Sequence, residues 1–283
     1  MSMQLEHNHE KCTGQAGSTF QLAMAQMLVE GGQVEANLQR AAGMIREAGT
    51  RGCKVVVLPE CLDWGWMHPA AQRLAQPIPG AYSDILGQAA GEAGVFVAAG
   101  LTERSGNRLY NAAVLISPEG EILLKHRKIN ELPFARDFYG IGDRLSVVET
   151  PLGKIGITIC ADNFPDSLEL ARAQILMGCQ LLLSPSSWAV EKDHDNRVEP
   201  YGGLWHQAYT TLARQNLTVI GVSNVGWLRG GPWSGRKCIG CSLAMGAGGQ
   251  VLAQGPYGEA AETLIIVDID LPARNGAAQF VGR

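Results

Sequence analysis

Hydrophobic and polar positions along the chain follow two different periods, one typical of strands and one typical of helices. Residues 20–24 are a strand-like apolar run, and apolar side chains in residues 37–48 recur at helical spacing. A second strand-like run at residues 181–183 is followed by a helical pattern over residues 204–215 and by a further run at residues 219–224. Alternation of this kind predicts an α/β fold built of packed layers.

The segment before the run at residues 181–183 contains a candidate helix start. Asp166 and Glu169 stand three residues apart, as the two partners of a capping box do. We therefore expect a helix that opens at these residues and continues to Met177.

Three apolar runs each end at a residue with useful chemistry. The run KVVVLP leads into Glu60, the run EILL leads through a basic tripeptide into Lys128, and the run KIGITI stops at Cys160. Reactive groups often lie at the carboxyl ends of strands in α/β proteins. We expect a carboxylate, an amine and a thiol to converge.

These three side chains suit nucleophilic catalysis by a thiol. A thiol is a poor nucleophile until a base removes its proton or a nearby cation favours the thiolate. Glu60 would be the base for Cys160, and Lys128 would place positive charge where an oxyanion develops and would favour the thiolate. The set predicts attack on a carbon–nitrogen bond through a thioester.

The surroundings of the three residues resemble the signatures of the nitrilase, or carbon–nitrogen hydrolase, superfamily. The segments LPE60, HRK128I and IC160ADNFP match its Glu, Lys and Cys signatures in the family's chain order, and the likeness covers residues 19–270. Supporting matches occur at Ala25–Gln26, Asn37, Tyr110–Asn111, Gly142–Asp143, Ser184–Pro185 and Trp188. The resemblance implies that Glu60, Lys128 and Cys160 are a catalytic triad.

The same resemblance sharpens the expected architecture. It implies a four-layer α-β-β-α sandwich in which two stacked mixed sheets are flanked by helices, formed here by one domain over residues 18–283. An outer helix layer of this fold commonly pairs with a second subunit, so the resemblance implies a homodimer or a higher homo-oligomer. It also implies that no metal and no organic cofactor is needed.

One departure from the family concerns the loop after the lysine. Many relatives carry a second glutamate seven or eight residues beyond it, where this chain has Ala135 and Arg136. The acids nearby are Glu131 and Asp137, either of which could take that place from a re-routed loop. Glu131 and Arg136 are therefore candidate substrate-binding residues.

The residues after Cys160 bear on specificity. The resemblance implies that the backbone N–H of Ala161 helps to bind the oxyanion. Relatives that hydrolyse N-carbamoyl amino acids place arginines three or four residues after the cysteine to hold a carboxylate, whereas Asn163 and Phe164 stand there in this chain. A negatively charged substrate is therefore disfavoured, and Asn163 is a candidate substrate contact.

Aromatic residues and one polar loop are candidates for the walls of a pocket. Trp188 and Tyr139 are predicted to bind substrate, and further candidate wall residues are Phe138, Trp64, Trp66 and the loop at residues 193–196. Each of these aromatic side chains is equally well explained as part of the core.

These features together predict hydrolysis of a small-molecule linear amide to a carboxylic acid and ammonia or an amine. A nitrilase and an N-carbamoyl amide hydrolase are the alternatives within the family. An alternative of another class is a non-catalytic or redox-sensing protein that uses Cys160 or the pair Cys238 and Cys241. That Cys-x-x-Cys pair has redox or zinc spacing, but a zinc ribbon needs a second pair and the remaining cysteines are isolated.

Composition and charge exclude some classes of binding partner. The chain has 283 residues, of which 46% are hydrophobic, and a formal net charge of −4 with Lys and Arg dispersed, so no nucleic-acid partner is expected. Residues 1–17 are polar and lack the apolar stretch of a signal peptide, and no apolar run is long enough to cross a bilayer. We expect a flexible tail at residues 1–17, no membrane partner, a small-molecule substrate and a cytoplasmic location.

Overall fold

Two six-stranded sheets form the centre of the molecule. The structure is a computed structural model that describes residues 17–271. The predicted tail therefore lies outside the described residues, except for residue 17. In spatial order the first sheet consists of β15 (Thr263–Leu271), β1 (Ser18–Gln26), β2 (Val55–Val57), β3 (Phe96–Ser105), β4 (Arg108–Ile116) and β5 (Ile122–Arg127). Strands β1, β2 and β3 are parallel, and the outer pairings are antiparallel.

The second sheet repeats this plan. In spatial order it consists of β14 (Val251–Gln254), β13 (Leu243–Met245), β10 (Thr218–Ser223), β8 (Leu181–Ser186), β7 (Gly153–Ile157) and β6 (Val147–Thr150). Its central strands β7, β8 and β10 are parallel. A small third sheet contains β11 (Val225–Trp227), β12 (Lys237–Ile239) and β9 (Ala189–Val190). The parallel strands of each large sheet bring their carboxyl ends to one edge.

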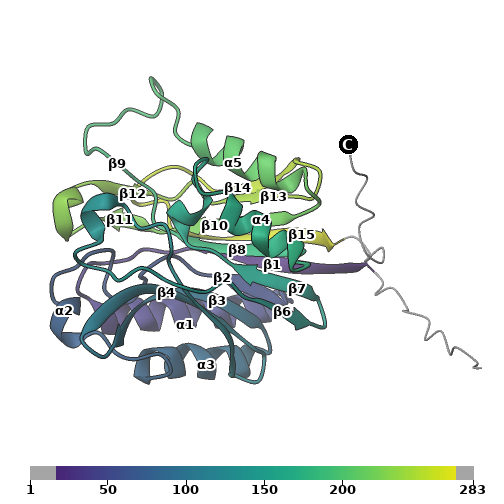
Figure 1. Cartoon of the computed structure of the whole chain (residues 1–283), viewed down its shortest axis with the longest axis horizontal. Coiled ribbons are helices and arrows are strands. Elements are labelled where there is room, and N and C mark those ends of the chain that lie inside the picture. The colour runs from purple at the N-terminus through teal and green to yellow at the C-terminus, as the bar shows by residue number, and fades with distance from the viewer. Residues whose placement is uncertain (1–16, 272–283) are drawn as a thin grey trace, which may run out of the picture.

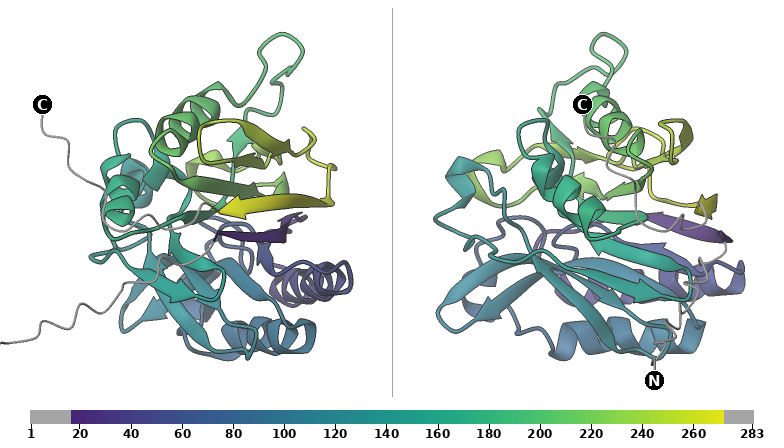
Figure 2. Two further views of the ribbon diagram at one scale, coloured as in Figure 1. Left: turned by 90° about the vertical axis from the view of Figure 1, so that its right-hand side faces the viewer. Right: turned by 45° about the vertical axis from the view of Figure 1, so that its right-hand side comes forward.

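Helices cover the outer face of each large sheet. Figures 1 and 2 show α1 (Val34–Thr50) and α3 (Ala81–Ala93) beneath the first sheet, and α4 (Glu169–Leu176) and α5 (Gly203–Ala213) above the second. The remaining helical turns are α2 (Ala71–Leu74), η1 (Pro133–Ala135), η2 (Cys160–Asn163) and η3 (Gly231–Trp233). This is the expected four-layer α-β-β-α arrangement, which the structure confirms.

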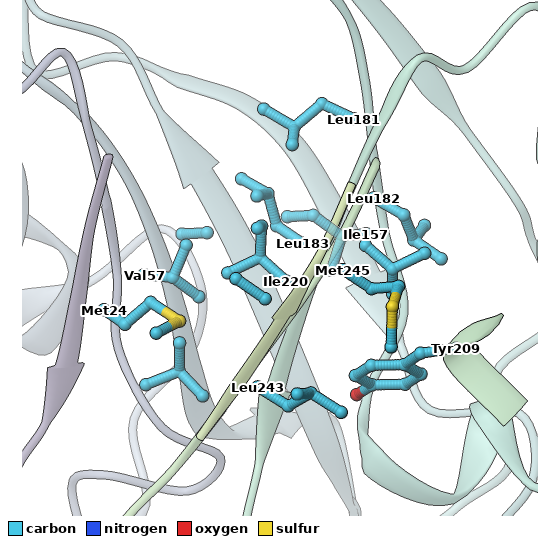
Figure 3. Packing of buried hydrophobic residues seen from close by; sticks show 14 of the residues in the cluster. Met24, Val57, Ile157, Leu181, Leu182, Leu183, Tyr209, Ile220, Leu243 and Met245 are labelled. Carbon is cyan, nitrogen blue, oxygen red and sulfur yellow. The ribbon is translucent and has the colours of Figure 1, made fainter. Parts of the chain in front are cut away.

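The space between the two sheets is filled by branched and sulfur-containing side chains. Figure 3 shows Met24 and Val57 of the first sheet near Leu183 and Ile220 of the second, all fully buried. The three valines of β2 are buried on both faces, as expected for a central parallel strand covered by a helix layer and by another sheet. The two sheets therefore share one apolar core, which fixes their strand ends relative to each other.

The predicted helix over residues 37–48 lies within α1, and its apolar stripe is the buried face. The predicted start of the next helix is wrong. Helix α4 begins at Glu169 without a side-chain cap, because residues 164–168 form turns in which the Ser167 hydroxyl donates to the carbonyl of Ala161 at 2.8 Å. In the part of the chain that is described, no helix is long and apolar enough to cross a membrane.

Candidate active site

Glu60, Lys128 and Cys160 follow three strands from both large sheets and meet where the sheets face each other. Glu60 lies three residues after β2, Lys128 directly follows β5, and Cys160 lies three residues after β7. The backbone N–H of Glu60 donates to the carbonyl of Ser186 in β8 at 3.2 Å, which ties the first sheet to the second at this point. The structure thus brings the three predicted residues together.

Glu60 and Lys128 form a buried ion pair. The Lys128 Nζ atom lies 2.7 Å from Glu60 Oε1, and each side chain is only 2% exposed. The same oxygen accepts a hydrogen bond from Asn111 Nδ2 at 2.6 Å, and the backbone N–H of Lys128 donates to the carbonyl of Asn111 at 2.8 Å. Asn111 therefore holds the carboxylate through its side chain and the lysine through its backbone.

Lys128 lies between two carboxyl groups. Glu131 Oε2 is 3.9 Å from Lys128 Nζ, and the Glu131 side chain is fully buried. Burial alone would lower the pKa of Lys128, but the effects of its neighbours, the charge of the Glu60 carboxylate first among them, outweigh it and hold this pKa well above its ordinary value. Burial raises the pKa of Glu131 to about 8 despite the opposing charge of Lys128. Lys128 is therefore charged at neutral pH, and Glu131 can hold a proton there.

The turn that carries Cys160 is strained and is fixed by its neighbour Asp162. Cys160 has a φ of 41°, in the left-handed region that non-glycine residues seldom adopt. The buried Asp162 carboxylate accepts backbone N–H groups of Ile159 at 2.9 Å and of Asn130 at 2.8 Å, and it lies 2.8 Å from His126 Nε2. Asp162 therefore fastens the cysteine turn to the loop that follows the lysine.

The environment of Cys160 favours the neutral thiol. Burial comes first and the charge of Glu60 second among the causes that hold the pKa of Cys160 well above its ordinary value. Lys128 and a hydrogen bond from the backbone N–H of Ser187 act in the opposite direction, but they are outweighed. Lys128 thus favours the thiolate, as expected, but its effect on the pKa of Cys160 is smaller than the effects of burial and Glu60. Cys160 and Glu60 line the same cavity, so a base for the thiol proton is present at the site.

Cys160 and Glu60 open into a cavity of about 410 Å³, a size typical of small-molecule sites. Ala161, Ser187 and Leu132 also line it. Its aromatic lining residues are Trp66, Phe164, Trp188, Tyr201, Trp205 and Trp233. The segment between β9 and α5, which projects beyond the layers in Figure 1, adds His194 and Glu199. The cavity is thus an aromatic chamber with the thiol and the carboxylate in its wall.

The predicted substrate-binding residues are divided between the cavity wall and the layer behind it. Ala161 and Trp188 line the cavity, whereas Asn163 is buried beneath it and donates to Thr158 Oγ1 and Ser184 Oγ, both at 2.9 Å. Tyr139 is buried and accepts the backbone N–H of Met67 at 2.9 Å.

The two candidate substrate-binding residues of the loop after the lysine, Glu131 and Arg136, do not line the cavity. Arg136 is exposed and donates to the backbone carbonyl of Glu131 at 3.3 Å. Glu131 and Lys128 are not part of the cavity lining: Lys128 contacts the Glu60 carboxylate from behind the wall, and Glu131 contacts Lys128. Of the two candidate replacements for the second glutamate, Glu131 is the one next to Lys128, since Asp137 is exposed.

Several residues of the site had no role assigned from the sequence. Asn111 was noted only as a supporting match, although its contact with Glu60 makes it part of the site. No sequence motif pointed to four further residues of the cavity lining. Glu199 and Tyr201 lie on the irregular loop before α5, Trp205 lies in the first turn of α5, and Trp233 lies in η3. Their approach to Cys160 depends on how the chain folds around the strand ends.

The pair Cys238 and Cys241 does not form a second reactive site in the described residues. Both thiols are free and buried, and burial raises the pKa of each to about 11. Such thiols are weakly nucleophilic at neutral pH. Between residues 17 and 271, no group of three or more His, Cys, Asp or Glu side chains is placed to hold a metal ion. The redox alternative therefore has little support from this pair.

Comparison with known proteins identifies the family of the chain. The family described as carbon-nitrogen hydrolase matches residues 21–279. An omega-amidase NIT2 of Xenopus tropicalis is 32% identical over 265 residues, which are 89% of each chain. A nitrilase of Pyrococcus abyssi is 31% identical and covers 83% of this chain and 84% of its own.

The fold has close counterparts among solved structures. A carbon-nitrogen hydrolase of Helicobacter pylori superimposes with a TM-score of 0.77 at 22% identity, covering 90% of each chain. At this identity the likeness concerns the fold alone. Because the family match spans most of the sequence, the chain belongs to the carbon–nitrogen hydrolase family, in the amidase-like branch of the nitrilase superfamily.

Proposed function

We propose that the protein hydrolyses a small-molecule linear amide to a carboxylic acid and ammonia or an amine, through a thioester on Cys160. The observation that carries the proposal is that the Cys160 thiol lines one cavity with the Glu60 carboxylate, which is itself held by Lys128 at 2.7 Å and by Asn111 at 2.6 Å. Amidases among the relatives, such as the omega-amidase of Xenopus tropicalis, support this choice.

The first half of the reaction forms the thioester. Because the resting thiol is protonated, Glu60 takes its proton as the sulfur attacks the amide carbon. The C–S bond forms and the carbonyl electrons move to oxygen. The positive charge of Lys128 and the backbone N–H of Ala161 stabilise this oxyanion. When the tetrahedral intermediate collapses, the C–N bond breaks and Glu60 returns its proton to the leaving nitrogen.

The second half releases the acid. Glu60, again a carboxylate, takes a proton from a water molecule that attacks the thioester carbon. The C–S bond then breaks, the acid leaves, and the proton on Glu60 returns to the sulfur. Asn111 and Lys128 both bind Oε1 of Glu60, so the same carboxylate is held in place through both halves.

Glu131 has a supporting role in this proposal. It takes the place of the family's second glutamate from a position only three residues after Lys128. Its 3.9 Å distance to Lys128 Nζ and its raised pKa suit a group that keeps the lysine in position while holding a proton itself. Because it lies behind the cavity wall, it acts through Lys128 and not by touching the substrate.

Nitrile hydrolysis is the second candidate, because the nitrilase of Pyrococcus abyssi is nearly as similar as the omega-amidases. Ammonia release from an amide and from the nitrile of the same acyl chain compares the two. We expect the amide to be the better substrate, and a higher kcat/KM for the nitrile would reverse the assignment.

The thioester is tested by trapping. Hydroxylamine added during amide turnover should intercept the acyl group and yield a hydroxamate, and Cys160→Ala should yield neither hydroxamate nor ammonia. Cys53→Ser is the matched control, since Cys53 is also a free buried thiol but lies outside the cavity lining. Ammonia release by Cys160→Ala at the parental rate would exclude the mechanism.

A further inference from the structure

The charges that face the cavity are of one sign. Its lining contains two carboxylates, Glu60 and Glu199, together with His194, and no Lys or Arg belongs to the lining formed by the described residues. Glu60 is bound by Lys128 and Asn111. Glu199 is exposed on the projecting loop, and within residues 17–271 its side chain makes no ion pair. Glu199 is therefore the carboxylate that is free to bind a ligand group.

Three cationic side chains that lie near lining residues in the sequence already have partners. Arg197 pairs with Asp195 at 2.6 Å, and Arg236 pairs with Glu191. Lys237 donates to the backbone carbonyl of His194 at 2.9 Å. None of these three cations lines the cavity. A carboxylate on the substrate would therefore find no Lys or Arg in the lining, since Lys128 lies behind the wall and is paired with Glu60.

The aromatic lining of the cavity also favours a cation over an anion. Aromatic rings attract cations to their faces and offer no comparable stabilisation to anions. The indole N–H of Trp205 donates to the Tyr201 hydroxyl at 2.8 Å, and the indole N–H groups of Trp66 and Trp188, which have no partner among the described residues, are buried in the wall and do not open into the cavity. Trp188 stacks on Trp205 with a centroid separation of 4.7 Å, which makes a continuous aromatic wall. A carboxylate placed against this wall would lose hydration without gaining a partner.

From these observations we infer that the acyl part of the substrate ends in a positively charged group, such as an alkylammonium, that is recognised by Glu199 and the aromatic wall. The inference rests on the proposed amide hydrolysis and adds its substrate class. Glu199 lies on the loop that leads from β9 to α5, whereas the thiol lies at the end of β7. The reacting amide and the cation would therefore occupy different parts of one cavity.

Three amides of matched length test the inference: one ends in an ammonium group, one in a methyl group and one in a carboxylate. We expect kcat/KM to be highest for the ammonium amide, by about tenfold or more over the methyl amide, and lowest for the carboxylate.

Substitutions of Glu199 test whether this residue causes the preference for the ammonium amide. Glu199→Gln should remove most of the advantage of the ammonium amide over the methyl amide, and Glu199→Lys should favour the carboxylate. Glu119→Gln, which removes an exposed carboxylate from the turn between β4 and β5, is the matched control and should change none of the three values.

The outcomes separate the two proposals. If the methyl amide is hydrolysed but the ammonium amide has no advantage, or keeps its advantage in Glu199→Gln, the assignment of Glu199 is wrong while amide hydrolysis stands. A preference for the carboxylate amide would overturn the substrate class. If none of the amides releases ammonia, amide hydrolysis is itself wrong, and the substrate class with it.

Discussion

Lys128 and Glu60 are joined by an ion pair of 2.7 Å in which neither side chain is more than 2% exposed. Burying two charges costs more hydration free energy than an exposed pair would, so such a pair is poor evidence for stability. Its value lies in position and charge. The pair fixes the orientation of a carboxylate in the wall that also holds the thiol, and it keeps an ammonium group directly behind that carboxylate.

We therefore expect Lys128→Met and Glu60→Gln each to lower kcat/KM by about 100-fold or more, because each removes a charge that the transition state uses. Both variants should remain folded, since a buried carboxyl that loses its cation can take up a proton instead of staying charged. Steady-state kinetics and circular dichroism on the same samples provide the measurement. Retained activity per folded molecule in either variant would show that the pair is structural.

Glu131 gives a prediction about pH and stability. Its pKa is raised from 4.5 to about 8 in the folded protein, so the folded state binds this proton more tightly than the unfolded chain does. Its contribution to stability is complete below pH 4.5 and is lost as the pH rises through about 8. Glu131→Gln cannot ionise. The free energy of unfolding of the variant relative to the parent should therefore increase between about pH 5 and about pH 9.

Chemical denaturation at a series of pH values measures this difference. Glu119→Gln serves as the control, because its carboxylate is exposed and its variant should track the parent at every pH. A relative stability of Glu131→Gln that stays flat over the same range would mean that Glu131 ionises normally in the folded protein.

A glycine at position 100 lets the backbone of β3 approach the backbone of Glu60 closely. A Cβ atom added at Gly100 in β3 would lie 2.5 Å from the Cα of Glu60 and 2.7 Å from the carbonyl oxygen of Pro59. Both contacts involve backbone, which cannot move aside without shifting the catalytic carboxylate. We expect Gly100→Ala to lower the free energy of unfolding by about 1–3 kcal/mol, as overpacking does, and to lower kcat together with it.

Gly43→Ala is the comparison for this variant. Gly43 is exposed within α1, and a Cβ there would meet no atom within 4 Å. Replacing a glycine inside a helix by alanine should stabilise the protein by up to about 1 kcal/mol without changing kcat. If Gly100→Ala behaved like Gly43→Ala, the close approach of β3 to Glu60 would have no functional importance.

The convergence of Glu60, Lys128 and Cys160 could be predicted from the sequence because each residue stands at the end of an apolar run, and strand ends in a layered α/β fold meet at one edge. Glu60 and Cys160 each follow a strand that the hydrophobic pattern itself reveals. The four layers needed the family resemblance in addition, because alternation alone does not say how many sheets form. Helix α1 followed from periodicity, since its buried residues recur at helical spacing.

The rest of the site depends on contacts between segments that have no regular pattern. Glu131 reaches Lys128 because the chain turns through η1 directly after it, which sequence spacing alone could not establish. Glu199 and Tyr201 reach the cavity on the loop between β9 and α5. The start of α4 was misplaced because Ser167 bonds back to the cysteine turn, a tertiary contact that overrides the local capping pattern.

The assembly expected from the family resemblance gives a last prediction. Of the two outer helix layers, the one formed by α4 and α5 exposes more large apolar side chains, with Leu176 at 78% and Met177 and Leu204 also exposed. Burying such side chains against a second copy is favourable, so we expect a homodimer formed through this layer. Light scattering should give a mass of twice 30.3 kDa.

Leu176→Glu should weaken this dimer, because it would place a charge in an apolar interface. We expect its dissociation constant to rise by about tenfold or more, corresponding to about 1.4 kcal/mol. Leu74→Glu is the control: Leu74 is 52% exposed on α2, away from the α4 and α5 layer, so its variant should remain dimeric. A parent protein that is monomeric at all concentrations would contradict the assembly. A dimer that Leu74→Glu weakens as much as Leu176→Glu would move the interface away from α4 and α5.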